Sequence, residues 1–184
     1  MPDRFPKPAA GRRRRGASAA IGALALLTAL LTAASVWAAF VYYPLRLGPA
    51  QPLPFSHRFH AGEKGISCFF CHPDAATGRR AGIPPLETCM LCHERIIITH
   101  PEIKRLRAHY FDRRPIAWAQ VYDVPEFVYF DHEAHVRRQV DCGACHGNVQ
   151  AMDRVRVAHE FTMGFCVQCH RDHQASHDCY VCHR

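Results

Sequence analysis

The sequence predicts a small, mainly irregular domain with short α-helices, attached to a membrane by one N-terminal transmembrane α-helix. Three observations lead to this fold class. The stretch 17–43 has no charged side chain, all 10 Cys and all 14 His follow residue 55, and one short Cys- and His-containing motif recurs. A length of 184 residues is enough for one compact domain and an anchor.

The charge distribution sets the predicted membrane topology. Residues 1–16 carry five of the seven net positive charges, and residues 17–43 carry none. As a helix, residues 17–43 would be about 40 Å long, which is enough to cross a hydrocarbon layer of about 30 Å with some tilt. Trp37, Tyr42 and Tyr43 suit the far interface. We expect residues 1–16 on the cytoplasmic side of a bacterial inner membrane, a single span over 17–43, and a helix end at Pro44.

A cleaved signal peptide is the alternative to an anchor, since the stretch Val36 to Ala38 offers small residues for cleavage. The apolar run is about twice as long as the usual signal core, which favours the anchor. Residues 44–54 are rich in Pro and Gly and are predicted to form a semi-extended linker. On either reading, residues 55–184 are expected to be exported to the periplasm.

All ten cysteines belong to one motif, C-x-x-C-H, which occurs five times. This is the attachment motif of c-type haem, in which two thiols form thioether bonds to the porphyrin and the next His binds the iron from the proximal side. The predicted thioether residues are Cys68, Cys71, Cys89, Cys92, Cys142, Cys145, Cys166, Cys169, Cys179 and Cys182, and the predicted proximal ligands are His72, His93, His146, His170 and His183. The sequence therefore predicts five covalently bound haem c groups.

Paired cysteines have two other common roles. Zinc sites use C-x-x-C pairs but need no His directly after the second Cys. A disulfide framework is compatible with export and does not require the motif either. Five placements of His directly after the second Cys favour haem.

Five haems on residues 55–184 leave only a short stretch of chain for each haem. That is too little for an ordinary apolar core, so the haems are expected to form the core of a multihaem cytochrome c with the chain wrapped around them. Apolar residues such as Phe69, Phe70, Leu91 and Phe165 are then expected to line haem faces.

A second pattern, F-x-H-x-x-H, occurs twice, beginning at Phe55 and again at Phe130. The first block contains His57 and His60, the second contains His132 and His135, and each block precedes a pair of haem motifs. This arrangement predicts a duplicated dihaem unit followed by one extra haem. We expect these four histidines to be distal ligands, with His57 and His132 on the haem that follows next in the sequence and His60 and His135 on other haems.

Four distal histidines leave the fifth iron without one. Met163, three residues before Cys166, is the first choice, and a thioether ligand would raise the potential of that haem. His159, His173 and His177 are alternatives, as is an open iron. His100 and His109 are expected at the surface or at propionates.

Two features of the exported part permit more than one reading. Arginines occur in pairs at 79–80, 113–114 and 137–138, and they suit haem propionates or a solvated surface. Residues 115–129 lie between the dihaem units and could form a strap across a haem or an edge where a partner docks.

The anchor, the five motifs, the two His blocks and the stretch from Thr162 to Arg171 resemble the pentahaem cytochrome subunit of alternative complex III. The His blocks are also similar to those of the cytochrome c3 and c7 class. The first resemblance implies electron transfer from a quinol-oxidising complex to a periplasmic acceptor or a terminal oxidase. It implies an iron–sulfur subunit and quinol-binding membrane subunits as partners, with a monohaem cytochrome c or another periplasmic protein as acceptor.

On this reading the chain has no catalytic residues and is not an enzyme on its own, because a single uncharged span cannot form a quinol pocket. Two alternatives are a stand-alone quinol dehydrogenase cytochrome that feeds a periplasmic reductase, and a multihaem reductase with an open haem. Nucleic-acid binding is not expected, since ten ionised propionates would make the loaded exported part acidic, with a charge of about −3 when oxidised.

Overall fold

The computed structural model describes residues 11–42 and 47–184, and only the backbone of residues 11–16. The chain divides into two compact units, Met1–Arg46 and Leu47–Arg184. Residues 1–10 of the predicted cytoplasmic segment lie outside the described residues, as do residues 43–46. The helix end expected at Pro44 is therefore among the positions that are not described.

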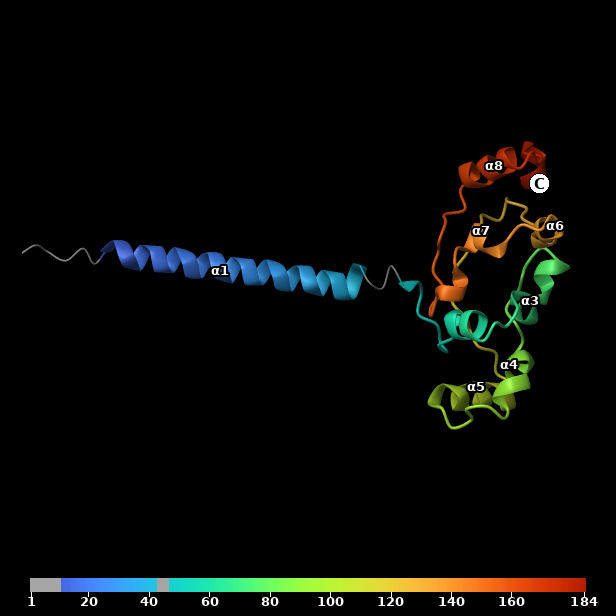
Figure 1. Cartoon of the computed structure of the whole chain (residues 1–184), viewed down its shortest axis with the longest axis horizontal. Coiled ribbons are helices and arrows are strands. Elements are labelled where there is room, and N and C mark those ends of the chain that lie inside the picture. Colours follow the sequence, from blue (N-terminus) through green and yellow to red (C-terminus); the bar gives the residue numbers. More distant parts are fainter. Residues whose placement is uncertain (1–10, 43–46) are drawn as a thin grey trace, which may run out of the picture. The chain divides into compact units, whose positions relative to one another are not determined.

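The described part of the first unit is one long helix. It consists of α1 (Gly11–Trp37) and a π-helical continuation, η1 (Ala38–Tyr42) (Figure 1). Its stretch Ala17–Tyr42 has a mean hydropathy of 2.1 and no buried residue. Among the described residues, this is the one helix that is long and apolar enough to cross a membrane.

Three hydroxyl side chains in the apolar part of α1 form hydrogen bonds within the helix. The hydroxyls of Thr28, Thr32 and Ser35 each donate to a backbone carbonyl one turn earlier, over 2.8–2.9 Å. Such local bonds are what an apolar environment requires of a hydroxyl group. The described part of the helix starts at Gly11, ahead of the predicted span, and the Arg residues that follow it have a high helix propensity.

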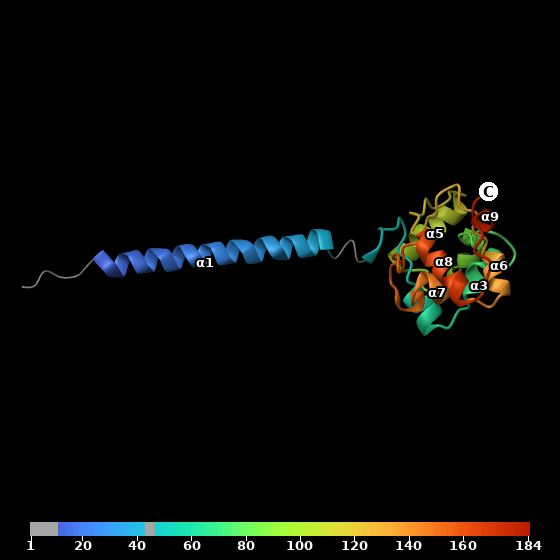
Figure 2. The same ribbon diagram turned by 90° about the horizontal axis from the view of Figure 1, so that it is seen from above.

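The second unit consists of short helices joined by irregular segments, as the sequence predicts (Figures 1 and 2). Among its residues, extended pairing is limited to one antiparallel bridge between Val128 and His183. The helices are η2 (Arg58–Glu63), α3 (Cys68–Cys71), η3 (Pro73–Ala76), α4 (Leu86–His93), α5 (Pro101–Phe111), α6 (His132–Arg137), α7 (Cys142–His146), η4 (Val149–Ala151), α8 (Met163–Asp172) and α9 (Cys179–Cys182).

The apolar core made by protein side chains is small. Its largest cluster consists of Leu53, Leu106 and Ile116, with Trp118 and Cys89 among the residues packed around it. No described side chain is completely buried. The phenylalanines of the first haem motif are 44 % and 47 % exposed, although Phe is one of the residue types most often found inside proteins. Exposed aromatic side chains beside the attachment motifs suit a chain that packs against a large apolar cofactor.

Residues 47–54, which the sequence predicts as part of a linker, pack within the second unit. Leu53 is buried in the apolar cluster, and Gln51 exchanges two hydrogen bonds of 2.8 and 2.9 Å with the backbone of Ala119. Gly48 has a φ of +75°, and a Cβ there would lie 2.1 Å from the Val155 carbonyl oxygen. Proline and glycine fix the path of this segment, but they do not prevent Leu53 from joining the core.

Candidate haem-attachment sites

Each of the five C-x-x-C-H motifs lies on a helical turn. They occupy α3, α4, α7, α8 and α9, and in α3 and α9 the His is the residue that follows the last turn. Residues i, i+3 and i+4 share one face of a helix, so the two Cys and the His of each motif lie on the same side. This is the arrangement that attachment of one porphyrin requires.

In three of these helices, the N-cap side chain accepts a hydrogen bond from a backbone amide of the first turn. Ser67 accepts a hydrogen bond from the Phe69 amide, Asp141 from the Gly143 amide and Thr162 from the Phe165 amide. An N-cap of this kind is worth about 1 kcal/mol. These three side chains therefore help to determine where each motif helix starts.

The cysteines of the described chain are free thiols, and none forms a disulfide. Burial raises the pKa of the Cys71, Cys89 and Cys145 thiols, with smaller contributions from neighbouring groups. Within residues 11–42 and 47–184, no group of three or more Cys, His, Asp or Glu has the geometry of a metal site.

Four motif histidines lie opposite a histidine of the F-x-H-x-x-H blocks. The ring centroids are 6.1 Å apart for His60 and His93, 6.3 Å for His132 and His146, and 5.9 Å for His135 and His170. Two imidazoles on one iron would be about 6 Å apart, because each iron–nitrogen bond is about 2 Å and each ring centre lies about 1 Å beyond its nitrogen. The fourth pair, His57 and His72, is close enough to interact electrostatically.

The three measured pairs differ in the angle between their rings. The planes of His132 and His146 are almost parallel, at 4°, whereas those of His60 and His93 are at 71°. His135 and His170 are intermediate, at 48°. The angle between axial imidazole planes controls the magnetic anisotropy of low-spin ferric haem, so each pair would have a distinguishable spectroscopic signature on a shared iron.

Backbone carbonyls fix the orientation of these imidazoles. A carbonyl oxygen can only accept, so an Nδ1 atom facing one must carry the proton, which leaves Nε2 free to bind a metal. Three block histidines and four motif histidines have this bond. The bonds run from His60 to Ser56, His132 to Arg79, His135 to Asp131, His72 to Gly82, His93 to Ile96, His170 to Ser176 and His183 to Phe127.

Two of the paired histidines are held in the neutral form. Burial, together with the nearby His72 and His60, lowers the pKa of His57 from 6.5 to about 4. Burial also lowers the pKa of His146, and His132 and His72 add to the effect. A neutral imidazole is the form that coordinates a metal. The Nδ1 atom of His57 is buried and has no hydrogen-bond partner among the described residues, unlike its counterparts above.

The other two histidines of the region 94–114 have different surroundings. His100 caps α5, and its Nδ1 accepts the Glu102 amide, so its Nε2 carries the proton and cannot bind a metal in this form. The Nδ1 atom of His109 donates to the Arg114 carbonyl, over 3.1 Å. The sequence predicts both histidines at the surface or at propionates. For His100, the structure shows a role as the N-cap of α5.

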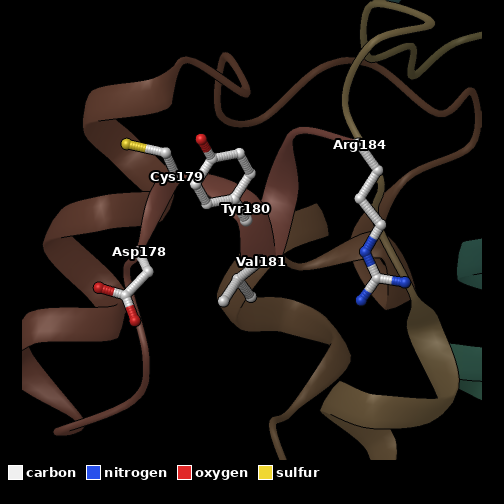
Figure 3. A pocket seen from close by; sticks show the side chains of 5 residues that line it. All are labelled: Asp178, Cys179, Tyr180, Val181 and Arg184. Carbon is white, nitrogen blue, oxygen red and sulfur yellow. The ribbon is translucent and has the colours of Figure 1, made fainter.

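The fifth motif lies beside the segment that separates the dihaem units. The Tyr129 amide donates to the Cys182 carbonyl over 2.6 Å, and the Phe127 ring stacks on His183 at 5.8 Å. These contacts join the end of the segment 115–129 to the fifth motif. A cavity of about 540 Å³ opens there, and Figure 3 shows Asp178 and Cys179 on one side of it and Arg184 on the other.

The residues considered for the fifth distal position are spread around α8. Met163 is the first residue of α8 and is 72 % exposed. The ring of His159 stacks on Phe165 at 5.4 Å, and His173 is the C-cap residue of α8. His177 donates from Nδ1 to the Ala175 carbonyl over 3.3 Å. These positions do not single out one ligand, and Met163 stays a prediction.

Several of the paired arginines have protein partners. Arg79 lies 3.7 Å above the Tyr129 ring, Arg114 pairs with Asp112 and Arg137 pairs with Glu133. All three therefore have a role in the protein that needs no propionate. The ion pair of Arg58 with Asp153 joins segments far apart in the chain, and no sequence pattern predicts it.

No protein-family model matches the chain. It is 28 % identical to the multiheme cytochrome c subunit of menaquinone reductase from Nitratidesulfovibrio vulgaris (strain Hildenborough), over 73 % of this chain and 77 % of that protein. This similarity supports covalently bound haem c and a multihaem cytochrome linked to quinone chemistry. It does not single out alternative complex III.

Proposed function

We propose that this chain is a membrane-anchored pentahaem cytochrome c that conducts single electrons between a membrane quinol-oxidising complex and periplasmic acceptors or a terminal oxidase. Alternative complex III is the complex that the motifs resemble. The observation that carries the proposal is the set of four imidazole pairs, three of them with centroids 5.9–6.3 Å apart. Haem iron takes up and releases one electron at a time, and two strong axial ligands suit that role rather than catalysis on a substrate.

The chain's own residues would hold the five haems in the following way. The ten motif cysteines form the thioether bonds, and the five motif histidines bind the irons from the proximal side. His57, His60, His132 and His135 supply distal ligands to the first, second, third and fourth haems, and Met163 supplies the fifth. The carbonyls opposite Nδ1 keep Nε2 of the block histidines available to the metal in every measured pair.

Quinone chemistry belongs to partner subunits in this proposal. The span Ala17–Tyr42 contains no charged residue and no buried one, so it offers no proton-accepting group for a quinol. Iron–sulfur and quinol-binding membrane subunits would supply that site, and a monohaem cytochrome c or another periplasmic protein would accept the electrons. The N-terminus would be cytoplasmic and residues 55–184 periplasmic.

A second candidate function is the same electron transfer in the opposite direction. The similar protein from N. vulgaris is named as a subunit of a menaquinone reductase, a name that describes electrons moving to the quinone. This chain would then carry electrons from a periplasmic donor toward membrane quinone. The contacts of the five motifs are compatible with either direction.

The test is isolation of the full chain from its native membrane in mild detergent. We expect co-migration with larger subunits on a native gel stained for haem, five haems per chain by intact mass, and low-spin ferric signals in the paramagnetic resonance spectrum. Reduction of the isolated complex by quinol, or of quinone by the complex, separates the two directions. Migration as a lone cytochrome that turns over quinol by itself would contradict the proposal, and a prominent high-spin signal would favour a reductase with an open haem.

A further inference from the structure

The first F-x-H-x-x-H block is held by the second dihaem repeat. The Arg58 amide donates to the Met152 carbonyl over 2.9 Å. The Asp153 carboxylate accepts a 2.6 Å hydrogen bond from Ser56 and two bonds of 3.0 and 3.1 Å from the Arg58 guanidinium. These hydrogen bonds lower the pKa of Asp153, so the carboxylate is ionised at neutral pH. The residues just after the third motif therefore support the ligands of the first two.

The second block is held by the first repeat in the same way. The His132 and Glu133 amides donate to the carbonyls of Arg79 and Gly78, over 3.2 and 3.1 Å. The His132 imidazole adds a 2.7 Å bond to the Arg79 carbonyl. Both supporting segments follow the first motif of a repeat, so the exchange between the repeats is reciprocal.

This exchange places the first and third motifs side by side. The thiols of Cys68 and Cys142 are close enough to interact, and His72 is close enough to affect His146. Phe69 of the first motif and Cys142 of the third line one cavity of about 310 Å³. The second motif and the whole second histidine block separate these two motifs in the sequence.

The remaining motifs continue from this central pair in both directions. On one side, the thiol of Cys71 in the first motif is a neighbour of Cys89 in the second. On the other side, Cys145 in the third motif is a neighbour of Cys166 and Cys169 in the fourth. Cys166 is in turn a neighbour of Cys182 in the fifth.

We infer that the chain holds its attachment motifs in one row, in the order second, first, third, fourth, fifth, and that Asp153 is a positioning residue for the first histidine block. The spatial order of the motifs differs from their order in the sequence because the first motif of each repeat lies next to the first motif of the other repeat. This inference rests on the proposed function, since it concerns the chain as a haem-bearing cytochrome.

The row is tested by locating the five irons in the loaded chain, by anomalous diffraction at the iron edge. The expected nearest neighbours are second and first, first and third, third and fourth, and fourth and fifth. A second haem that lies beside the third, with the first at an end of the row, would overturn the inference. Five haems with that different order would leave the proposed function intact, so the two failures are distinguishable.

The role of Asp153 is tested by paramagnetic resonance on full-length variants. In Asp153→Ala, the strongly anisotropic signal expected from the 71° pair of His60 and His93 should fall on the order of twofold or more, while the signal of the almost parallel pair should be unchanged. Asp153→Glu should restore it. The matched control is Asp112→Ala, which removes an exposed carboxylate that pairs only locally with Arg114. An unchanged spectrum in Asp153→Ala, or loss of the parallel pair's signal instead, would refute the positioning role.

Discussion

Replacement of His60 by Ala tests the assignment of the distal ligands most directly. The His60 ring is 6.1 Å from that of His93 and is stacked on Phe55 at 4.4 Å, and its Nδ1 atom donates to the Ser56 carbonyl. Two iron–nitrogen bonds and two ring radii account for a separation of about 6 Å, so the distance between the two rings matches that of two imidazoles on one iron. His60→Ala removes one side of that coordination sphere.

The expected change is confined to one haem in five. We expect about one fifth of the ferric spin to move from low-spin to high-spin signals, since the chain has five attachment motifs and only the second would lose its distal ligand. The lost component should be the most anisotropic of the measured pairs, because the His60 and His93 planes are at 71°. Spin quantitation of the fully oxidised protein at low temperature measures both quantities, with intact mass confirming that all five haems are still attached.

His100→Ala is the matched control. His100 lies in the same repeat, but its Nδ1 accepts a backbone amide and its Nε2 therefore carries the proton. This variant should keep five low-spin haems. The reasoning fails if His60→Ala retains the anisotropic signal, if it loses the signal of a nearly parallel pair, or if His100→Ala produces the same conversion.

Three further predictions concern the core, the fifth iron and the anchor. Leu106→Ala empties a buried position in the apolar cluster and should cost about 2–5 kcal/mol, which lowers the melting temperature by on the order of 10 °C. The control Ile83→Ala, at a 59 % exposed position outside the haem motifs, should change it little. Met163→His should lower the highest of the five reduction potentials by on the order of 0.1 V in a redox titration. It should also abolish the far-red absorption band of Met-ligated ferric haem. If neither quantity changes, Met163 is not an iron ligand. Replacement of residues 1–43 by a cleavable signal peptide should release a fully haem-loaded protein into the soluble periplasmic fraction, and retention in carbonate-washed membranes would show that other contacts anchor it.

The positions that could be predicted from the sequence are those whose chemistry requires a fixed local spacing. A porphyrin needs two thiols and an imidazole on one helical face, and C-x-x-C-H supplies them within a single turn. His132 lies opposite His146, which is where ligation of the next haem in the sequence requires it to be. The single apolar helix near the N-terminus follows in the same way from the unbroken high hydropathy of Ala17–Tyr42.

The remaining features depend on contacts between distant segments. The sequence leaves the partners of His60 and His135 open because His at i and i+3 could reach any neighbouring haem, and only the fold brings them to His93 and His170. Leu53 carries no signal that separates it from a linker residue, yet it is buried against Leu106. The Pro and Gly content of this segment predicts that it has no regular secondary structure. Whether such a segment packs against the domain depends on contacts with distant residues, which the composition does not show.

Each dihaem repeat contains its own histidine ligands, but the backbone that holds those ligands in place comes from the other repeat. In each measured pair, the distal histidine and the motif that it faces belong to the same repeat, whereas the backbone that holds the block belongs to the other repeat. A repeat by itself would therefore contain its ligands but lack the groups that hold them in place. The extra fifth motif then makes the two ends of the row unlike. Cys89 of the second motif packs against the apolar cluster, while Tyr180 of the fifth is 85 % exposed beside an open cavity. The second end of the row therefore rests on the protein's own apolar core, whereas the fifth end is supported by Phe127 and Tyr129 of the segment 115–129.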